Sequence, residues 1–448
     1  MDLAMPKPLA ARKRIPATRR ERWAWYLYDF GNSAYAAVVL LAVYSTYFTG
    51  TGVGGAEGSR LWGLSVGIAM LVVAISSPVL GALADFTAAK KRFLFFFTAM
   101  ACVFTALLFF VEKGNVFTGM LFFILAEIGY RASQVYYNAL LPEIATPDEV
   151  GTVSGNGWAI GSAGGIVCLL IVLVLIMFVG GPMMVRLSFL ITAVFFALST
   201  LPLFLFIRER AEPQPLPAGE NYFTVPFKQL WQTVKHVRNY KQFIKFIIAF
   251  LVYNDGILMT LDFAAIIGAV LFGLTQQQLI IFMIIVQVTS VIGAYLSGIA
   301  ADRFGGKYTL VVSLVLMVIS VSLLIFAQNL TVFFLIGALA GFALTGVQAV
   351  SRTMVSQLSP EGQSGEFYGF FAVAGRSSSF LGPTIYGWLA AEAALYFEAH
   401  GQPVLQAEQS GVRVGVLSIV FFLLIGLCLL VTLVKNVRPA EAHAHIGD

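Results

Sequence analysis

The sequence predicts an all-α integral membrane protein in which twelve transmembrane helices form two pseudo-symmetric six-helix bundles. Of the 448 residues, 58% are hydrophobic and only 11% are charged, whereas a soluble domain carries about 25% charged residues. A run of about 20 apolar residues is long enough to cross the hydrocarbon core of a bilayer. Such runs lie at 24–49, 61–84, 92–111, 116–141, 153–179, 185–207, 243–272, 276–300, 308–328, 330–357, 366–396 and 411–435.

Lysine and arginine gather in alternate loops. Basic residues precede the first run, lie between runs two and three, fill the central loop, and follow runs eight and twelve, while the loops that alternate with these hold only Arg60, Lys113, Arg186 and Arg413. Because Lys and Arg are enriched in cytoplasmic loops, both termini are predicted to be cytoplasmic, in the plasma or inner membrane. The first run is too long for the apolar region of a signal peptide and is predicted to be retained. Each basic tract adjoins a span, which argues against nucleic acid as a partner.

Sequence features of the first half recur in the second. Span two ends GALAD and span eight ends GIAAD, while TPDEVGTVSG has a counterpart in SPEGQSGEFYG at nearly the same offset. Matching loops at a fixed offset predict the duplication of a six-span unit. The predicted organisation is a basic tail at 1–22, a bundle at 23–207, a linker with an amphipathic surface helix at 208–242, a second bundle at 243–435, and a tail at 436–448.

Polar residues interrupt the first and fourth spans on one helical face each. An isolated charge at the centre of a bilayer costs about 2.5–3.5 kcal/mol on insertion scales, so both faces are predicted to line a polar interior. Side chains three, four or seven residues apart share a helical face. The polar residues are Asp29, Asn32 and Ser33 in span one, and Glu127, Arg131, Gln134 and Asn138 in span four, with Tyr137 beside them.

Counting along these two helices at about 1.5 Å per residue places Arg131 within reach of Asp29, with Glu127 one turn deeper. If Arg131 neutralises one carboxylate, the other lacks a full partner and can exchange a proton. A purely structural pair that locks two helices together is the alternative interpretation.

The second half holds a counterpart in span seven, where Asn254 and Asp255 precede Gly256 about halfway along. A glycine next to a buried polar pair predicts a local break of the helix that presents backbone groups to a cavity, with a plain packing glycine as the alternative. Asp262 lies two turns further on, nearer the far side, where it can reach outer water. Arg376 lies deep in span eleven and could bind a substrate carboxylate through two parallel hydrogen bonds. A salt bridge from this arginine to an acid of another helix is the alternative.

The sequence holds no pattern typical of an enzyme. It lacks a Gly-rich loop that ends in Lys-Ser or Lys-Thr, and its three cysteines and four histidines do not have the spacing of metal ligands. No Ser–His arrangement for nucleophilic catalysis is readable. We therefore predict neither catalysis nor a metal or other cofactor.

Two loops resemble the signature of the major facilitator superfamily, namely GALADFTAAKKR and GIAADRFGGK, although Ala88 and Ala89 replace a usual Gly and basic residue. In that signature Gly permits close helix approach and Asp pairs with basic residues, which implies a cytoplasmic gate. Its residues would be Gly81, Asp85, Lys91, Arg92, Gly298, Asp302, Arg303 and Lys307, with Arg352 nearby. The segments WYLYDFGNSAYAAVVL, YYNALLPEIATPDEVGTVSGNGWAIGSAGG and QAVSRTMVSQL are similar to the autophagy-related vacuolar amino-acid effluxers and their prokaryotic relatives.

This resemblance covers about residues 22–435 and implies a transporter of alternating access that exports amino acids. The predicted function is therefore proton-coupled export of a small organic solute, with membrane lipids as surroundings and no obligatory protein partner. Export of amphipathic drugs or lipids, and a non-transporting sensor or scramblase, are the alternatives. The predicted binding or coupling residues are Asp29, Asn32, Glu127, Arg131, Gln134, Tyr137, Asn138, Asn254, Asp255 and Arg376.

Overall fold

The computed structural model describes residues 17–87, 89–145, 150–210, 240–358 and 380–435, together with isolated positions between these ranges. Every regular element in these residues is helical, which confirms the predicted fold class. The first half contains α1 (Arg19–Tyr35), η1 (Ala36–Ala42), α2 (Tyr44–Thr46), η2 (Tyr47–Val53), α3 (Gly55–Thr87), α4 (Lys90–Leu107), η3 (Leu108–Phe110), α5 (Val116–Ala139), α6 (Leu141–Ile144), α7 (Val150–Phe178) and α8 (Pro182–Phe206). The second half contains α10 (Lys241–Phe272), α11 (Gln276–Phe304), α12 (Gly306–Phe326), α13 (Leu330–Leu358), α15 (Leu381–Ala399) and α16 (Val404–Leu433).

In the described part of the chain, eleven helical stretches are long and apolar enough to cross a membrane. Eleven of the twelve predicted spans overlap them. The remaining prediction, 366–396, contains α15, and most of its residues before α15 fall outside the described ranges. The chain is therefore a multi-pass membrane protein with a span count close to the predicted twelve.

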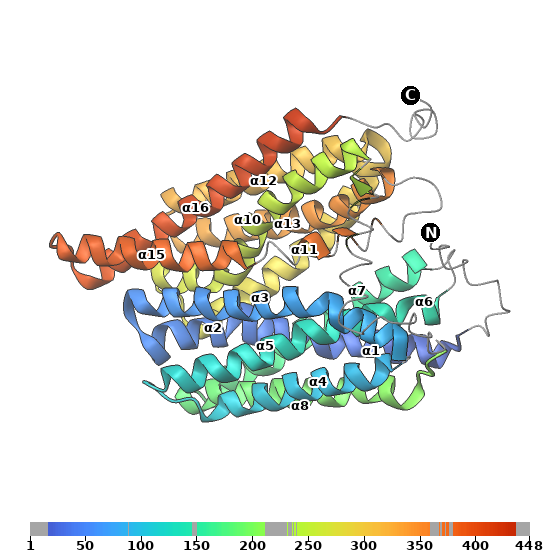
Figure 1. The fold of residues 1–448 in the computed structure, drawn as a ribbon. Coiled ribbons are helices and arrows are strands. Elements are labelled where there is room, and N and C mark those ends of the chain that lie inside the picture. The colour runs from blue at the N-terminus through green and yellow to red at the C-terminus, as the bar shows by residue number, and fades with distance from the viewer. Residues whose placement is uncertain are drawn as a thin grey trace.

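The helices form two bundles, one from α1 to α8 and the other from α10 to α16 (Figure 1). Contacts between the bundles run from α3 to α15, from α7 to α11, and from η1 and α2 to α10. The start of α1 and the end of α16 lie toward one end of the molecule, and α15 lies against α3 at the opposite end, on the left of Figure 1.

The first span begins earlier than hydropathy indicates and runs from Arg19 to Val53. It begins at Arg19 because Thr18 and Glu21 form a capping box, in which the Thr18 hydroxyl accepts from the Glu21 N–H and the Glu21 carboxylate accepts from the Thr18 N–H. The span also contains two π-helical stretches, η1 and η2, which widen its turns. Wide turns of this kind are rare in proteins, and those that do occur are often found at functional sites.

Glycine lets α3 approach α15 at backbone distance. A Cβ atom added at Gly387 would lie 2.6 Å from the carbonyl oxygen of Ser59, and one added at Gly63 would collide with the carbonyl oxygen of Pro383. Only glycine fits at such separations, since a helix surface without side chains permits the closest packing. The two bundles are thus in direct backbone contact at this end of the molecule.

Candidate functional site

The centre of the candidate site is a buried ion pair within α5. Arg131 Nε lies 2.7 Å from Glu127 Oε1, and the Glu127 side chain is 0% exposed while that of Arg131 is 21% exposed. The pair forms because residues four apart on a helix are neighbours. Because the pair is buried, Glu127 depends on Arg131, since a carboxylate removed from water needs a charged or hydrogen-bonded partner.

Depth counting places Asp29 within reach of Arg131, whereas in the structure its side chain lies at the contact between α1 and α7. Its carboxylate packs against α7, where a Cβ added at Gly161 would lie 2.5 Å from Asp29 Oδ2 and 3.0 Å from Ser33 Oγ. Asn32, on the same stripe, is buried. Within the described residues the salt bridges include none between Asp29 and Arg131, so this structure brings Asp29 to the α1–α7 contact instead.

The other predicted residues of α5 differ in their surroundings. Tyr137 is buried and its ring stacks on those of Trp25 and Tyr28, at centroid distances of 4.4 and 4.8 Å. The backbone carbonyl of Tyr137 also accepts a hydrogen bond from Trp25 Nε1 at 3.1 Å, which fastens α5 to α1. Gln134 is half-buried and Asn138 is exposed.

In the second half, Asp255 is buried in α10, and Asn254 Nδ2 donates to the carbonyl oxygen of Gly375 at 3.5 Å. α10 is one continuous helix through Gly256, so the break that the glycine suggested is absent from these described residues. The reason is packing, because a Cβ at Gly256 would lie 2.9 Å from Leu423 of α16. Arg376 lies outside the described residues.

Asp262 is the residue whose position the sequence did not reveal. Its side chain is only 2% exposed, far from the contact with outer water that we expected. Trp62 of α3, whose indole N–H donates to the Asp262 carbonyl, also packs against Phe123, one turn before Glu127 on α5, and so links Asp262 of the second half to the helix that carries the pair. The seven-residue separation of Asp255 and Asp262 was the available signal, because it places both acids on one face of α10.

Of the predicted gate residues, the two lysines make contacts within their own half and Arg352 makes one with the other half. Lys91 Nζ donates to the carbonyl oxygen of Ile207 at 2.7 Å, and Lys307 Nζ donates to that of Val431 at 3.1 Å, so each lysine binds within its own half. Arg352 of α13 lies 5.2 Å from the ring of Trp158 of α7 and thereby reaches the other half.

Of the remaining gate residues, Arg92 and Arg303 are exposed and Gly298 is half-buried. Gly81 and Asp85 lie in α3, and Asp302 lies in α11, but their side chains fall outside the described part of the chain.

A buried cluster of charges ties the predicted cytoplasmic ends of the first bundle together. Lys90 Nζ lies 3.0 Å from Glu143 Oε1, and Arg210 Nη2 lies 2.9 Å from Glu21 Oε1. The Lys90 backbone N–H donates to Glu209, and burial raises the pKa of the Glu209 carboxyl. This cluster joins α1, α4, α6 and the segment that follows α8.

Glu143→Gln is expected to destabilise the protein. The variant removes the Glu143 carboxylate from the Lys90 ammonium, whose side chain is 11% exposed, and breaking a buried pair in this way costs about 3–5 kcal/mol. Thermal unfolding in detergent should show a melting temperature several degrees below that of the parent protein. Glu112→Gln is the matched control, because Glu112 is 66% exposed in its pair with Arg186 and such a pair contributes about 0–1 kcal/mol. Equal melting temperatures for both variants would contradict the structural role of the cluster.

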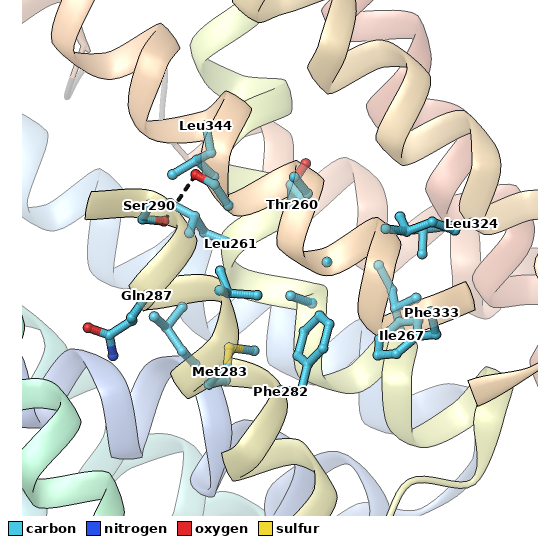
Figure 2. Close-up of a pocket in the computed structure, with 17 residues that line it drawn as sticks. Thr260, Leu261, Ile267, Phe282, Met283, Gln287, Ser290, Leu324, Phe333 and Leu344 are labelled. Carbon is cyan, nitrogen blue, oxygen red and sulfur yellow. Dashed lines mark hydrogen bonds between the residues drawn. The ribbon is translucent and has the colours of Figure 1, made fainter. Parts of the chain in front are cut away.

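An apolar cavity of about 110 Å³ lies in the second bundle, next to the first (Figure 2). α10, α11 and α13 supply most of its lining, and Leu41 of η1 contributes from the other half. Figure 2 shows Phe282, Met283 and Phe333 around it, and Gln287 at its edge. The amide of Gln287 faces Gly165 of α7, where an added Cβ would lie 3.3 Å from it.

Two helical bundles with ionisable groups buried at their contact define a membrane transporter of the major facilitator type. The chain belongs to the vacuole effluxer Atg22-like family, whose model matches residues 62–393. This result confirms the family and the fold class that the sequence motifs indicated.

Similar proteins agree with this assignment. The chain is 28% identical over 379 residues to the uncharacterized MFS-type transporter YxiO of Bacillus subtilis (strain 168), and the match covers 82% of this chain and 87% of that protein. It is 25% identical over 268 residues to autophagy-related protein 22 of Yarrowia lipolytica, which covers 52% of this chain and 45% of the fungal protein. The chain thus spans less than half the length of that fungal relative.

Solved structures share the fold. A bacterial homologue of the human lysosomal transporter Spinster, in an inward-facing and unoccupied conformation, has a TM-score of 0.68 at 14% identity and covers 94% of this chain and 98% of its own. The nucleoside transporter NupG has a TM-score of 0.62 at 13% identity, covering 92% and 99% respectively.

Proposed function

We propose that this membrane transporter exports a small organic solute by alternating access, with amino acids as the solute class and protons as the coupling ion. The observation that carries the proposal is the buried Glu127–Arg131 pair of α5, which the contacts of Trp62 connect to the buried Asp262 of the other half. Charges buried between two bundles are expensive to maintain for packing alone. They suit a solute that carries charges of both signs, because a guanidinium binds a carboxylate and a carboxylate binds an ammonium group.

We infer that the structure represents the inward-facing state. Several inter-half contacts lie near the junction of the first two spans, where Thr46 Oγ1 donates to Gln276 Oε1 at 3.1 Å and Trp62 Nε1 donates to the Asp262 carbonyl at 3.1 Å. Arg60 also lies 3.7 Å from Glu392 of α15. These contacts hold together the end opposite the termini, which we place outside the cytoplasm from the distribution of basic residues.

The amino-acid assignment is what the resemblance of the sequence segments to vacuolar amino-acid effluxers implies. The family is described as vacuole effluxers, and the fungal relatives are autophagy-related proteins. Export from the cytoplasm across the plasma or inner membrane is the direction that we assign to this chain.

A second candidate substrate class is favoured by the cavity of Figure 2. Its lining is apolar apart from Thr260, Gln287 and Ser290, and apolar pockets with a few polar groups bind amphipathic molecules. Under this alternative the protein exports amphipathic compounds, whose apolar part occupies the cavity.

Counterflow in reconstituted vesicles tests these proposals. Vesicles loaded with unlabelled L-amino acids should accumulate a radiolabelled L-amino-acid mixture well above protein-free vesicles, because exchange needs no energy source. Accumulation of a fluorescent amphipathic dye without amino-acid exchange would favour the second candidate. Lipid exchange between leaflets, with no flux of either amino acids or dye, would instead indicate a scramblase.

A further inference from the structure

Asp262 is held at the contact between the halves. Its backbone carbonyl accepts a hydrogen bond from Trp62 Nε1 of α3 at 3.1 Å, and Trp62 is itself fully buried. Thr260 and Leu261, which precede it in α10, line the cavity of Figure 2. The position of the Asp262 backbone is therefore fixed by contacts from both bundles.

The carboxylate of Asp262 is buried without compensation in the described part of the chain. Its Oδ2 atom has no hydrogen-bond partner there, and neither has Oε2 of Glu127. Arg131 is the cation of the adjacent pair, and its Nε already donates to Glu127 Oε1 at 2.7 Å. An ionised carboxylate buried in this way costs several kcal/mol unless a cation or a proton joins it.

The charges do not balance among the described residues. Trp62 donates to the Asp262 carbonyl and also packs on Phe123 of α5, one turn before Glu127, at a ring-centroid distance of 4.5 Å. Near this contact two buried carboxylates, those of Glu127 and Asp262, accompany one guanidinium, that of Arg131, which leaves room for one further positive charge. The three groups meet only because α10 of the second half lies beside the first half in this state. Separation of the halves at this end would break the hydrogen bond between Trp62 and the Asp262 carbonyl. It would also weaken the attraction between the charges of Asp262 and Arg131, since a Coulomb interaction falls with distance.

We propose that Asp262 is the second-half residue that takes up one positive charge, either a proton or the ammonium group of the solute, opposite the Glu127–Arg131 pair. The proposal rests on the transport function above. It assigns to Asp262 the link between binding of this positive charge and the conformational change of the two halves. A cation bound here stabilises the state in which the three groups are together, because a ligand favours the state that binds it more tightly.

Asp262→Asn tests the proposal, with Asp262→Glu as the variant that keeps the charge. Glu398→Gln is the control, because Glu398 is an exposed acid near the end of α15 in the same half. Two measurements are made in vesicles: counterflow of a radiolabelled L-amino-acid mixture, and solute-driven proton movement reported by an internal pH dye. Asp262→Glu should retain part of whichever activity Asp262→Asn loses, which separates loss of charge from loss of fold.

The two sources of positive charge give different results. If the ligand is a proton, Asp262→Asn loses solute-driven proton movement and keeps counterflow. If the ligand is the solute ammonium, the same variant loses counterflow by at least tenfold. Where the parent protein shows flux, Asp262→Asn vesicles that match Glu398→Gln vesicles in both measurements would overturn the proposal.

A third measurement is independent of the transported solute. Dicyclohexylcarbodiimide reacts with protonated carboxyl groups in apolar surroundings, and mass spectrometry locates the modified residue. Labelling of Asp262 that falls as pH rises supports proton uptake even if the parent protein exchanges no amino acid. Absence of both labelling and any effect of Asp262→Asn on flux would overturn the inference, whereas absence of flux in the parent protein alone contradicts only the proposed function.

Discussion

Arg131→Gln is expected to abolish counterflow. The substitution removes the only cation described at the centre of the site and leaves Glu127, which is 0% exposed, without its partner at 2.7 Å. A solute carboxylate would lose its guanidinium, and a binding group of this kind contributes strongly because it forms charge-assisted hydrogen bonds. We expect exchange to fall by more than tenfold when measured at equal amounts of reconstituted protein.

Loss of stability must be separated from loss of binding in this experiment. Removing one partner of a buried pair costs about 3–5 kcal/mol, so the single variant should also melt at a lower temperature. The double variant Glu127→Gln, Arg131→Gln removes both charges and should recover much of the stability while exchange stays low. Recovery of exchange in the double variant would show that the pair only locks α5 in place. Arg186→Gln is the control, since Arg186 forms its pair with an exposed acid.

A covalent link between Thr46→Cys and Gln276→Cys is expected to stop transport almost completely. The Thr46 hydroxyl and the Gln276 amide oxygen are 3.1 Å apart and belong to different halves. If the halves must separate at this end in every cycle, a cross-link here arrests the cycle. The native cysteines Cys102, Cys168 and Cys428 would first be replaced by serine or alanine. Exchange should fall on oxidation or addition of a short dithiol linker, and return after reduction.

A cross-link inside one half provides the comparison. Cys168 Sγ lies 3.8 Å from Thr192 Oγ1, and both residues belong to the first bundle, on α7 and α8. Thr192→Cys, in a chain that keeps Cys168, should therefore form a link that leaves exchange nearly unchanged. Full exchange by the protein linked between residues 46 and 276 would rule out opening at this end.

Hydropathy located the spans well because a bilayer imposes a length and a composition on every helix that crosses it. Each of the eleven membrane-spanning stretches in the described residues overlaps one predicted run, with boundaries that differ by at most eight positions. The start of the first span differed since a capping box at Thr18 and Glu21 extends the helix through residues that are not apolar. Hydropathy carries no information about such caps.

The candidate site was only partly predictable, because its geometry depends on how two helices face each other. The Glu127–Arg131 pair follows from a separation of four residues on one helix. Asp262 did not follow, since its depth along α10 says nothing about Trp62 and Arg131 of the opposite half. Asp29 was expected within reach of Arg131 from depth alone, whereas its carboxylate packs against Gly161 of α7.

The wide turns of η1 have a consequence for the direction of the first span. In η1 the Val43 N–H donates to the Val38 carbonyl, five residues back, at 2.8 Å. The stretch thus contains more residues than a regular helix needs, and each residue corresponds to about 100° of rotation. Shortening the chain by one residue between Ala36 and Ala42 would swing Thr46 away from Gln276 while leaving Asp29 on Gly161. The extra residue of η1 therefore sets the rotation between the polar face that carries Asp29 and the contact of Thr46 with Gln276 of the other half.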